Sequence, residues 1–98
     1  MYRKDFYKEK SEAEIEKSVR DEGFDPVKIN DSPGFVYSPH SHPQMKLIAI
    51  LSGGMRVTVA NEEFELEKGD RLYIPGNIIH SAVVGKRGCS FFWSEKIV

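Results

Sequence analysis

Beginning at Phe24, short runs rich in Val, Ile, Tyr and Phe alternate with turn signals about every 8 to 12 residues. This spacing is typical of an all-β sandwich or barrel, because each run is long enough for one strand and too short for a packed helix. In residues 55–59 apolar and polar side chains alternate, so we expect a strand with one buried face. The predicted strands cover residues 27–29, 34–39, 44–51, 55–60, 63–67, 71–74, 79–84 and 90–94, and the predicted turns residues 52–54, 61–62, 68–70, 75–77 and 85–88.

A charged segment of different character precedes the strands. Ser11 and Glu14 match a capping box, and Gly23 is a suitable C-cap, which together predict a helix over residues 12–22. The apolar stripe of this helix is thin, so we expect it to lie on the surface of the domain, and a solvated face is favoured over a partner-binding one. We therefore predict a helical lead-in over residues 1–23 and a β-barrel over residues 24–98, forming one domain overall.

The bulk composition excludes several classes of partner. The chain has 98 residues and a net charge of −1, so it lacks the basic excess expected of a nucleic-acid-binding or membrane-surface protein. The lone Cys89 cannot form an internal disulfide, and no apolar run is long enough to span a bilayer. We expect a cytoplasmic protein whose small core gains stability from a closed barrel, a metal or a partner subunit.

The histidines are the strongest candidates for chemistry. The chain has three, and two of them, His40 and His42, are two positions apart, so on an extended strand they face the same way. The third, His80, follows a strand and a turn near the C-terminus. Three neutral imidazoles around one point form a common site for a first-row divalent metal.

The spacing of these residues resembles the two signature motifs of the cupin superfamily. The first motif is G-x5-H-x-H-x3,4-E-x6-G, and this chain keeps its spacing from Gly34 through His40 and His42 to Gly53. The second is G-x5-P-x-G-x2-H-x3-N, matched at Gly69, Pro75 and His80. The resemblance covers residues 34–84 and implies a double-stranded β-helix, which is a jelly-roll barrel. It also implies a small-molecule pocket above a metal (Fe, Mn, Ni or Zn) on the three histidines, and pairing through sheet edges into a homodimer.

The chain departs from these motifs at three positions. Lys46 stands where the family has its glutamate ligand, Asn77 replaces a glycine, and Val84 replaces the final asparagine. The Asn77 change is mild, since Asn tolerates a left-handed turn. Lys46 shares strand parity with the histidines, and an ammonium close to a divalent cation is unfavourable.

Three arrangements would remove this conflict. Lys46 can turn away from the metal, it can be neutral and act as a base or ligand, or the site can hold no metal and bind an anion. Gln44, of matching parity, can supply an amide oxygen or orient a water. We prefer a three-histidine metal site completed by water, with a metal-free cupin as the alternative.

Other candidate residues are aromatic. Tyr37, Tyr73 and Trp93, like Phe91 and Phe92, can line the barrel mouth, although ordinary core packing explains most of them. Arg71 is expected to point outward into solvent, and Cys89 to be a buried, unreactive thiol.

The resemblance implies two classes of function. One is a metal-dependent oxygenase or isomerase in which Lys46 assists as a catalytic residue through charge or proton transfer, and the other is a non-catalytic, small-ligand binding or sensing module.

Overall fold

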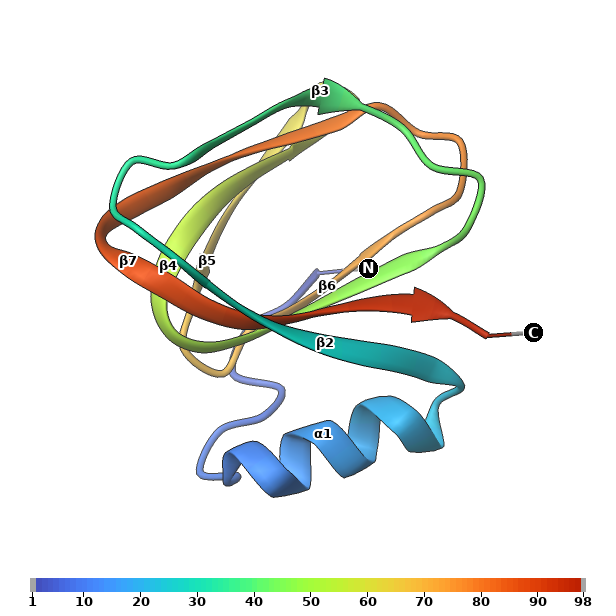
Figure 1. The fold of residues 1–98 in the computed structure, drawn as a ribbon, viewed down its shortest axis with the longest axis vertical. Helices are drawn as coiled ribbons and strands as arrows, with labels where there is room; N and C mark the ends of the chain where they lie inside the picture. The colour runs from blue at the N-terminus through green and yellow to red at the C-terminus, as the bar shows by residue number, and fades with distance from the viewer. Residues whose placement is uncertain (1, 98) are drawn as a thin grey trace.

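The computed structural model describes residues 2–97 and confirms an all-β jelly-roll barrel with one short N-terminal helix (Figure 1). All of the strand pairs are antiparallel, and the most extensive pair joins β4 to β7. Strands follow one another in the order β1-β6-β4-β7-β2, with β3 paired to β7 and β5 to β4. The elements are β1 (Tyr2–Arg3), α1 (Glu12–Asp21), β2 (Phe24–Asp31), β3 (Val36–His40), β4 (Lys46–Val59), β5 (Glu62–Glu67), β6 (Arg71–Ile74) and β7 (His80–Lys96).

Two predicted turns, at residues 52–54 and 85–88, are wrong, because β4 and β7 run through them without a break. The two strands stay paired around a corner of the barrel, with shifts of register on either side of residues 52 and 53. At this corner a Cβ on Gly53 would lie 2.1 Å from the carbonyl oxygen of Gly88. The glycines that signal a turn in the sequence therefore form a bulged bend, at which the two backbones approach too closely for any side chain.

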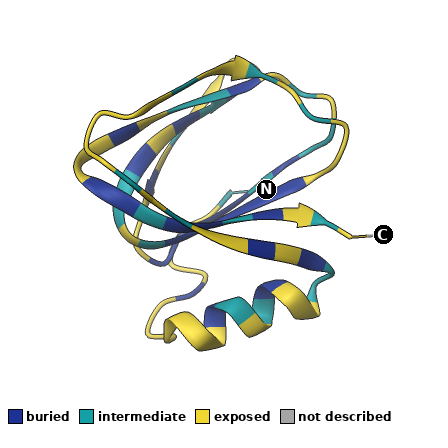
Figure 2. Ribbon diagram, in the orientation of Figure 1, coloured by how far each residue is buried: buried dark blue, intermediate teal, exposed yellow. Residues whose placement is uncertain are grey.

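The sheet is buried on both faces along the first half of β4, which explains the continuous apolar run there (Figure 2). Ile48 and Ile50 point into the barrel, where they join the inner core. Leu47 and Ala49 point the other way and pack with the residues under the helix. The inner core contains Ile48, Ile50, Met55, Val57, Val59, Leu66, Leu72, Ile74, Val84, Cys89 and Phe91, and the outer layer contains Tyr7, Ile15, Val19, Phe24, Leu47, Ala49 and Phe92.

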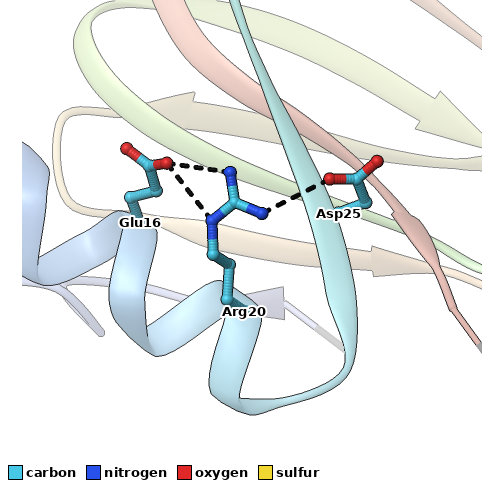
Figure 3. A network of polar contacts seen from close by, with 3 residues as sticks. All are labelled: Glu16, Arg20 and Asp25. Carbon is cyan, nitrogen blue, oxygen red and sulfur yellow. Dashed lines mark hydrogen bonds and ion pairs between the residues drawn. The ribbon is translucent and has the colours of Figure 1, made fainter.

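Helix α1 lies on the outside of the barrel, as predicted, and its capping box is confirmed. The backbone N–H of Glu14 donates to the Ser11 hydroxyl, and the Glu14 carboxylate accepts from the backbone of Ser11. Figure 3 shows the ion pairs of Arg20 on α1, which lies 3.0 Å from Glu16 on the same helix and 3.4 Å from Asp25 on β2. These three side chains are exposed, so the ion pairs contribute little to stability.

No helix among the described residues is long and apolar enough to cross a membrane.

Arg71 differs from expectation, because its side chain is buried and not solvated. It forms an ion pair of 2.5 Å with Glu22 and lies between the rings of Phe6 and Tyr73, 3.9 and 4.5 Å from their centroids. The Phe6 ring and the Glu22 carboxylate both belong to the segment that precedes β2. Arg71 therefore links the N-terminal segment to the sheet. The sequence around β6 does not indicate these contacts, because they come from distant parts of the chain.

Candidate metal centre

The three histidines meet at one end of the barrel. His40 ends β3 and lies directly across from His80, the first residue of β7, while His42 lies in the loop that follows β3. The ring centroids are 4.5 to 5.3 Å apart, and one candidate ligand nitrogen from each residue lies within 4.8 Å of the others. One small cation between them is therefore within reach of all three rings.

Backbone carbonyls orient two of these rings. The Nδ1 atoms of His40 and His80 lie 2.5 Å from the Ser38 oxygen and 3.0 Å from the Ile78 oxygen. Since a carbonyl only accepts, each Nδ1 donates, and in the neutral form of the ring the lone pair is then on Nε2. The Nε2 of His80 is buried and has no hydrogen-bond partner in the described structure. Such an orphaned acceptor, in a ring held by its other nitrogen, fits the role of a metal ligand.

The surroundings also favour the neutral form of two of the rings, those of His42 and His80. Burial lowers the pKa of His42, and the nearby charges of Lys46 and His40 lower it further. Burial is likewise the main cause that lowers the pKa of His80. Because only a neutral imidazole can bind a metal, both side chains are competent ligands near pH 7. The donor set suits Fe, Mn, Ni or Zn, and three imidazoles alone do not discriminate among them.

A tight contact between two loops positions His42. The backbone N–H of Asn77 donates to the His42 carbonyl at 2.6 Å, and Asn77 has the left-handed φ of +62° expected from its motif position. A Cβ on Gly76 would lie 2.3 Å from the Pro43 oxygen. The turn that precedes His80 thus holds the loop that carries His42, which explains the need for glycine at residue 76.

An apolar cavity of about 230 Å³ adjoins the three histidines inside the barrel. Apart from the imidazoles, its described lining offers hydroxyl groups only from Tyr37 and Ser81 and an indole N–H from Trp93. The lining residues are Ile29, Tyr37, His40, His42, Ile48, Met55, Val57, Ile74, His80, Ser81, Ala82, Phe91 and Trp93. Three of the predicted pocket residues, Tyr37, Phe91 and Trp93, therefore lie at this cavity, whereas Phe92 is buried in the outer layer.

The hydroxyl of Tyr37 donates to the Asp31 carboxylate at 2.6 Å. Burial raises the pKa of Tyr37, and the hydrogen bond to Asp31 raises it further. Tyr37 is therefore held as a neutral phenol and does not serve as a base near neutral pH. Asp31, at the end of β2, is a partner that the sequence analysis missed.

Lys46 lies on the inner face of β4 at the rim of the barrel and is 5% exposed. Its Nζ is 2.6 Å from Oε1 of Glu95, the residue opposite it on β7, and 5.4 Å from the centroid of the Trp93 ring. Lys46 and Gln44 line an open groove that shares Trp93 with the cavity. Glu95 is a carboxylate partner that the motif positions alone do not predict.

Two residues lie away from the histidines. Tyr73 is on the outer side of the sheet, where its hydroxyl bonds Glu22 and its ring packs 5.7 Å from that of Phe24, so it does not line the cavity. Cys89 is buried in the inner core, and burial raises the pKa of its thiol to about 12, so it is unreactive.

Comparison with known proteins agrees with this architecture. The dimethylsulfoniopropionate lyase DddW of Ruegeria pomeroyi is 36% identical over 59 residues, which cover 60% of this chain and only 39% of the lyase. An RmlC-like cupin from Shewanella frigidimarina superposes with a TM-score of 0.70 at 22% identity, over 78% of this chain and 68% of that one. Oxalate decarboxylase of Bacillus subtilis, studied for its Mn(II) centres, superposes with a TM-score of 0.70 at 22% identity, over 76% and 21% of the two chains.

At these identities the two structural similarities establish the fold alone. The family assignment is independent of them, because residues 28–94, more than half of the chain, match the family described as the cupin domain. The chain belongs to the cupin family.

Proposed function

We propose that this cupin binds a divalent transition metal through His40, His42 and His80 and uses it to act on a small organic molecule. The observation that carries the proposal is the buried, unpartnered Nε2 of His80 beside two further imidazoles. A buried acceptor without a partner is costly, and a metal ion removes that cost. When bound, the metal supplies Lewis acidity and open coordination positions for a ligand or oxygen.

The cavity limits the size and polarity of the ligand. A volume of about 230 Å³ equals roughly eight water molecules at about 30 Å³ each. Its walls are mainly aliphatic and aromatic, so they favour a compact apolar body, with a polar end directed toward the three histidines. Trp93 and Tyr37 then serve as walls, and the phenol of Tyr37 stays protonated.

The reaction we propose is oxygenation or isomerisation. Because Tyr37 and Ser81 supply the only hydroxyl groups of the described cavity lining, few side chains there can carry a proton, and chemistry centred on a metal suits such a site. Lys46, held at the rim, is proposed to assist with charge or proton transfer. Elimination is a second candidate, favoured by the similarity to the Ruegeria pomeroyi lyase.

A titration followed by a substrate screen tests both parts of this proposal. Trp93 is the single tryptophan, and its ring centroid lies 6.0 Å from that of His42, so quenching of its fluorescence by Ni²⁺ reports on the site alone. We expect saturable quenching with one ion per chain, and its loss in His80→Ala. A lack of saturation would contradict the metal site.

The metal-loaded protein is then incubated with a library of small acids, alcohols and carbonyl compounds that includes dimethylsulfoniopropionate. Oxygen consumption detects oxygenation, and NMR detects isomerisation or elimination. Turnover that requires His80 supports an enzyme. Saturable ligand binding without turnover would instead favour a non-catalytic binding module.

A further inference from the structure

The rim of the barrel contains a buried cation close to the proposed metal site. Lys46 is 5% exposed and lies over the face of Trp93, whose ring is 6.0 and 6.1 Å from those of His42 and His80. An ammonium held out of solvent this close to the rings acts electrostatically on the site. The same field opposes a dication at the three imidazoles.

Glu95 is the only described carboxylate within ion-pair distance of this ammonium. Strand register fixes the pair, since Lys46 and Glu95 are directly opposite each other where β4 meets β7. The contact of 2.6 Å is short, and the lysine side chain is 6% exposed while that of the glutamate is 51% exposed. The carboxylate thus neutralises the lysine on the solvent side of the rim without leaving water itself.

We propose that Glu95 is the charge-balancing residue of this site, which makes a three-histidine metal centre compatible with Lys46. This inference rests on the proposed function. The pair carries no net charge, so the histidines experience a near-neutral rim in place of an isolated ammonium. Glu95 acts through Lys46 and is a positioning residue.

Removing one charge or both gives three different expectations. Glu95→Gln leaves the ammonium unbalanced and should weaken metal binding. Lys46→Met leaves the carboxylate free and should strengthen it. The double variant has no charge at either position, so its affinity should return to that of the wild type.

A purely structural salt bridge would behave differently. Breaking it would lower thermal stability in both single variants and leave metal affinity unchanged. The ion pair between Arg56 and Glu65 is a matched control, because it also joins neighbouring strands, at 2.5 Å, but both side chains are exposed. Glu65→Gln should therefore leave metal affinity unchanged.

The test is calorimetric titration of the full chain with Ni²⁺ at pH 7.5 and low salt, with thermal denaturation of every variant. We expect affinity to fall about tenfold or more in Glu95→Gln, to rise by a similar factor in Lys46→Met, and to return to within about threefold of wild type in the double variant. Added salt should reduce the two single-variant effects, because it screens the unbalanced charge.

The outcomes separate this inference from the proposed function. Wild-type binding that is lost in His80→Ala but unchanged in both single variants would overturn the role of Glu95 and leave the metal site intact. Absence of binding to the wild type would overturn both. If Glu95→Gln does not fold, the comparison of Lys46→Met with the double variant decides, since equal affinities in that pair would overturn the role of the carboxylate.

Discussion

At the three histidines, protons would compete with the proposed metal for the same nitrogen atoms. The pKa values of His42 and His80 are lowered from 6.5 in the folded chain, mainly by burial. Below about pH 6.5 the unfolded chain therefore binds protons that the folded chain does not. The free energy of unfolding is therefore highest above pH 6.5. It decreases as the pH falls through the lowered pKa values of the two histidines in the folded chain.

We accordingly predict that the metal-free protein loses stability between pH 6.5 and 5. Urea denaturation at pH 7.5, 6.5, 5.8 and 5.0 measures the free energy of unfolding directly. In His80→Gln the decrease should be smaller, because one of the two contributing groups is absent. A stability that is constant or increases across this range would contradict the assignment of neutral rings.

The sequence predicted the histidine positions because motif spacing translates directly into strand register. It could not predict the partners of the site, since these come from other strands. Glu95 pairs with Lys46 from 49 positions away, and Asp31 accepts from Tyr37 across a loop. Strand composition allows Tyr73 to line the pocket or to pack in the core, and its side chain in fact packs on the opposite face of the sheet.

Among the elements, the corner shared by β4 and β7 depends on close backbone approach. Gly53 has a φ of +71°, and a Cβ there would meet the Gly88 oxygen at 2.1 Å. Gly34 has a similar φ of +78°, but a Cβ added there would have no atom within 4 Å apart from its chain neighbours. Gly34→Ala therefore costs only the left-handed backbone penalty, about 1–2 kcal/mol.

Gly53→Ala adds a steric clash to the same backbone penalty, and we predict a total cost of about 3 kcal/mol or more. Chemical denaturation of both variants isolates the contribution of the corner. Equal costs for the two substitutions would show that the strands can separate at this corner, contrary to the structure.

The turn at residues 75–77 is the element that couples the two histidine motifs. In Gly76→Ala the new methyl group would displace the Pro43 carbonyl and shift the loop that carries His42. We predict a loss of about 1–3 kcal/mol in stability and weaker Ni²⁺ binding.

Gly85→Ala is the matched control, because its φ is not left-handed and its Cβ would lie 3.3 Å from the Gly54 oxygen, a tight contact that a small shift relieves, against 2.3 Å at Gly76. We expect this change to alter stability by less than about 1 kcal/mol and to leave the affinity for Ni²⁺ unchanged. Unaltered Ni²⁺ affinity in Gly76→Ala would show that the loop is not needed to position His42.

The composition of the segments predicted where strands occur. It did not predict that β4 and β7 each continue through a predicted turn. Turn-forming residues also occur at bulged corners of continuous strands, which is why the turns predicted at residues 52–54 and 85–88 are wrong. Strand β1, formed by Tyr2–Arg3, carries no local signal and exists because it pairs with β6.

At the scale of the whole molecule, the barrel gains a second buried layer from the N-terminal segment. Val19 of α1 and Tyr7 are almost fully buried against the outer face of the sheet. Asp70 accepts hydrogen bonds from the backbone of Asp5 and from the hydroxyl of Tyr2. The charge-rich lead-in therefore contributes core residues to the same compact structure.

We further predict that the protein is a homodimer, since cupins commonly pair through sheet edges. Light scattering at several concentrations should give twice the mass of the chain. A monomeric mass at the highest concentration would contradict this prediction without affecting the account of the metal site.

The claim that His40, His42 and His80 bind a metal can be checked by the metal content of the protein purified without an affinity tag. Mass spectrometry of the metals should find about one first-row transition metal per chain, either as purified or after incubation with Fe, Mn, Ni or Zn and desalting. His40→Ala and His80→Ala, prepared in parallel, should contain little or none. Wild-type protein without stoichiometric metal after all four incubations would contradict the claim.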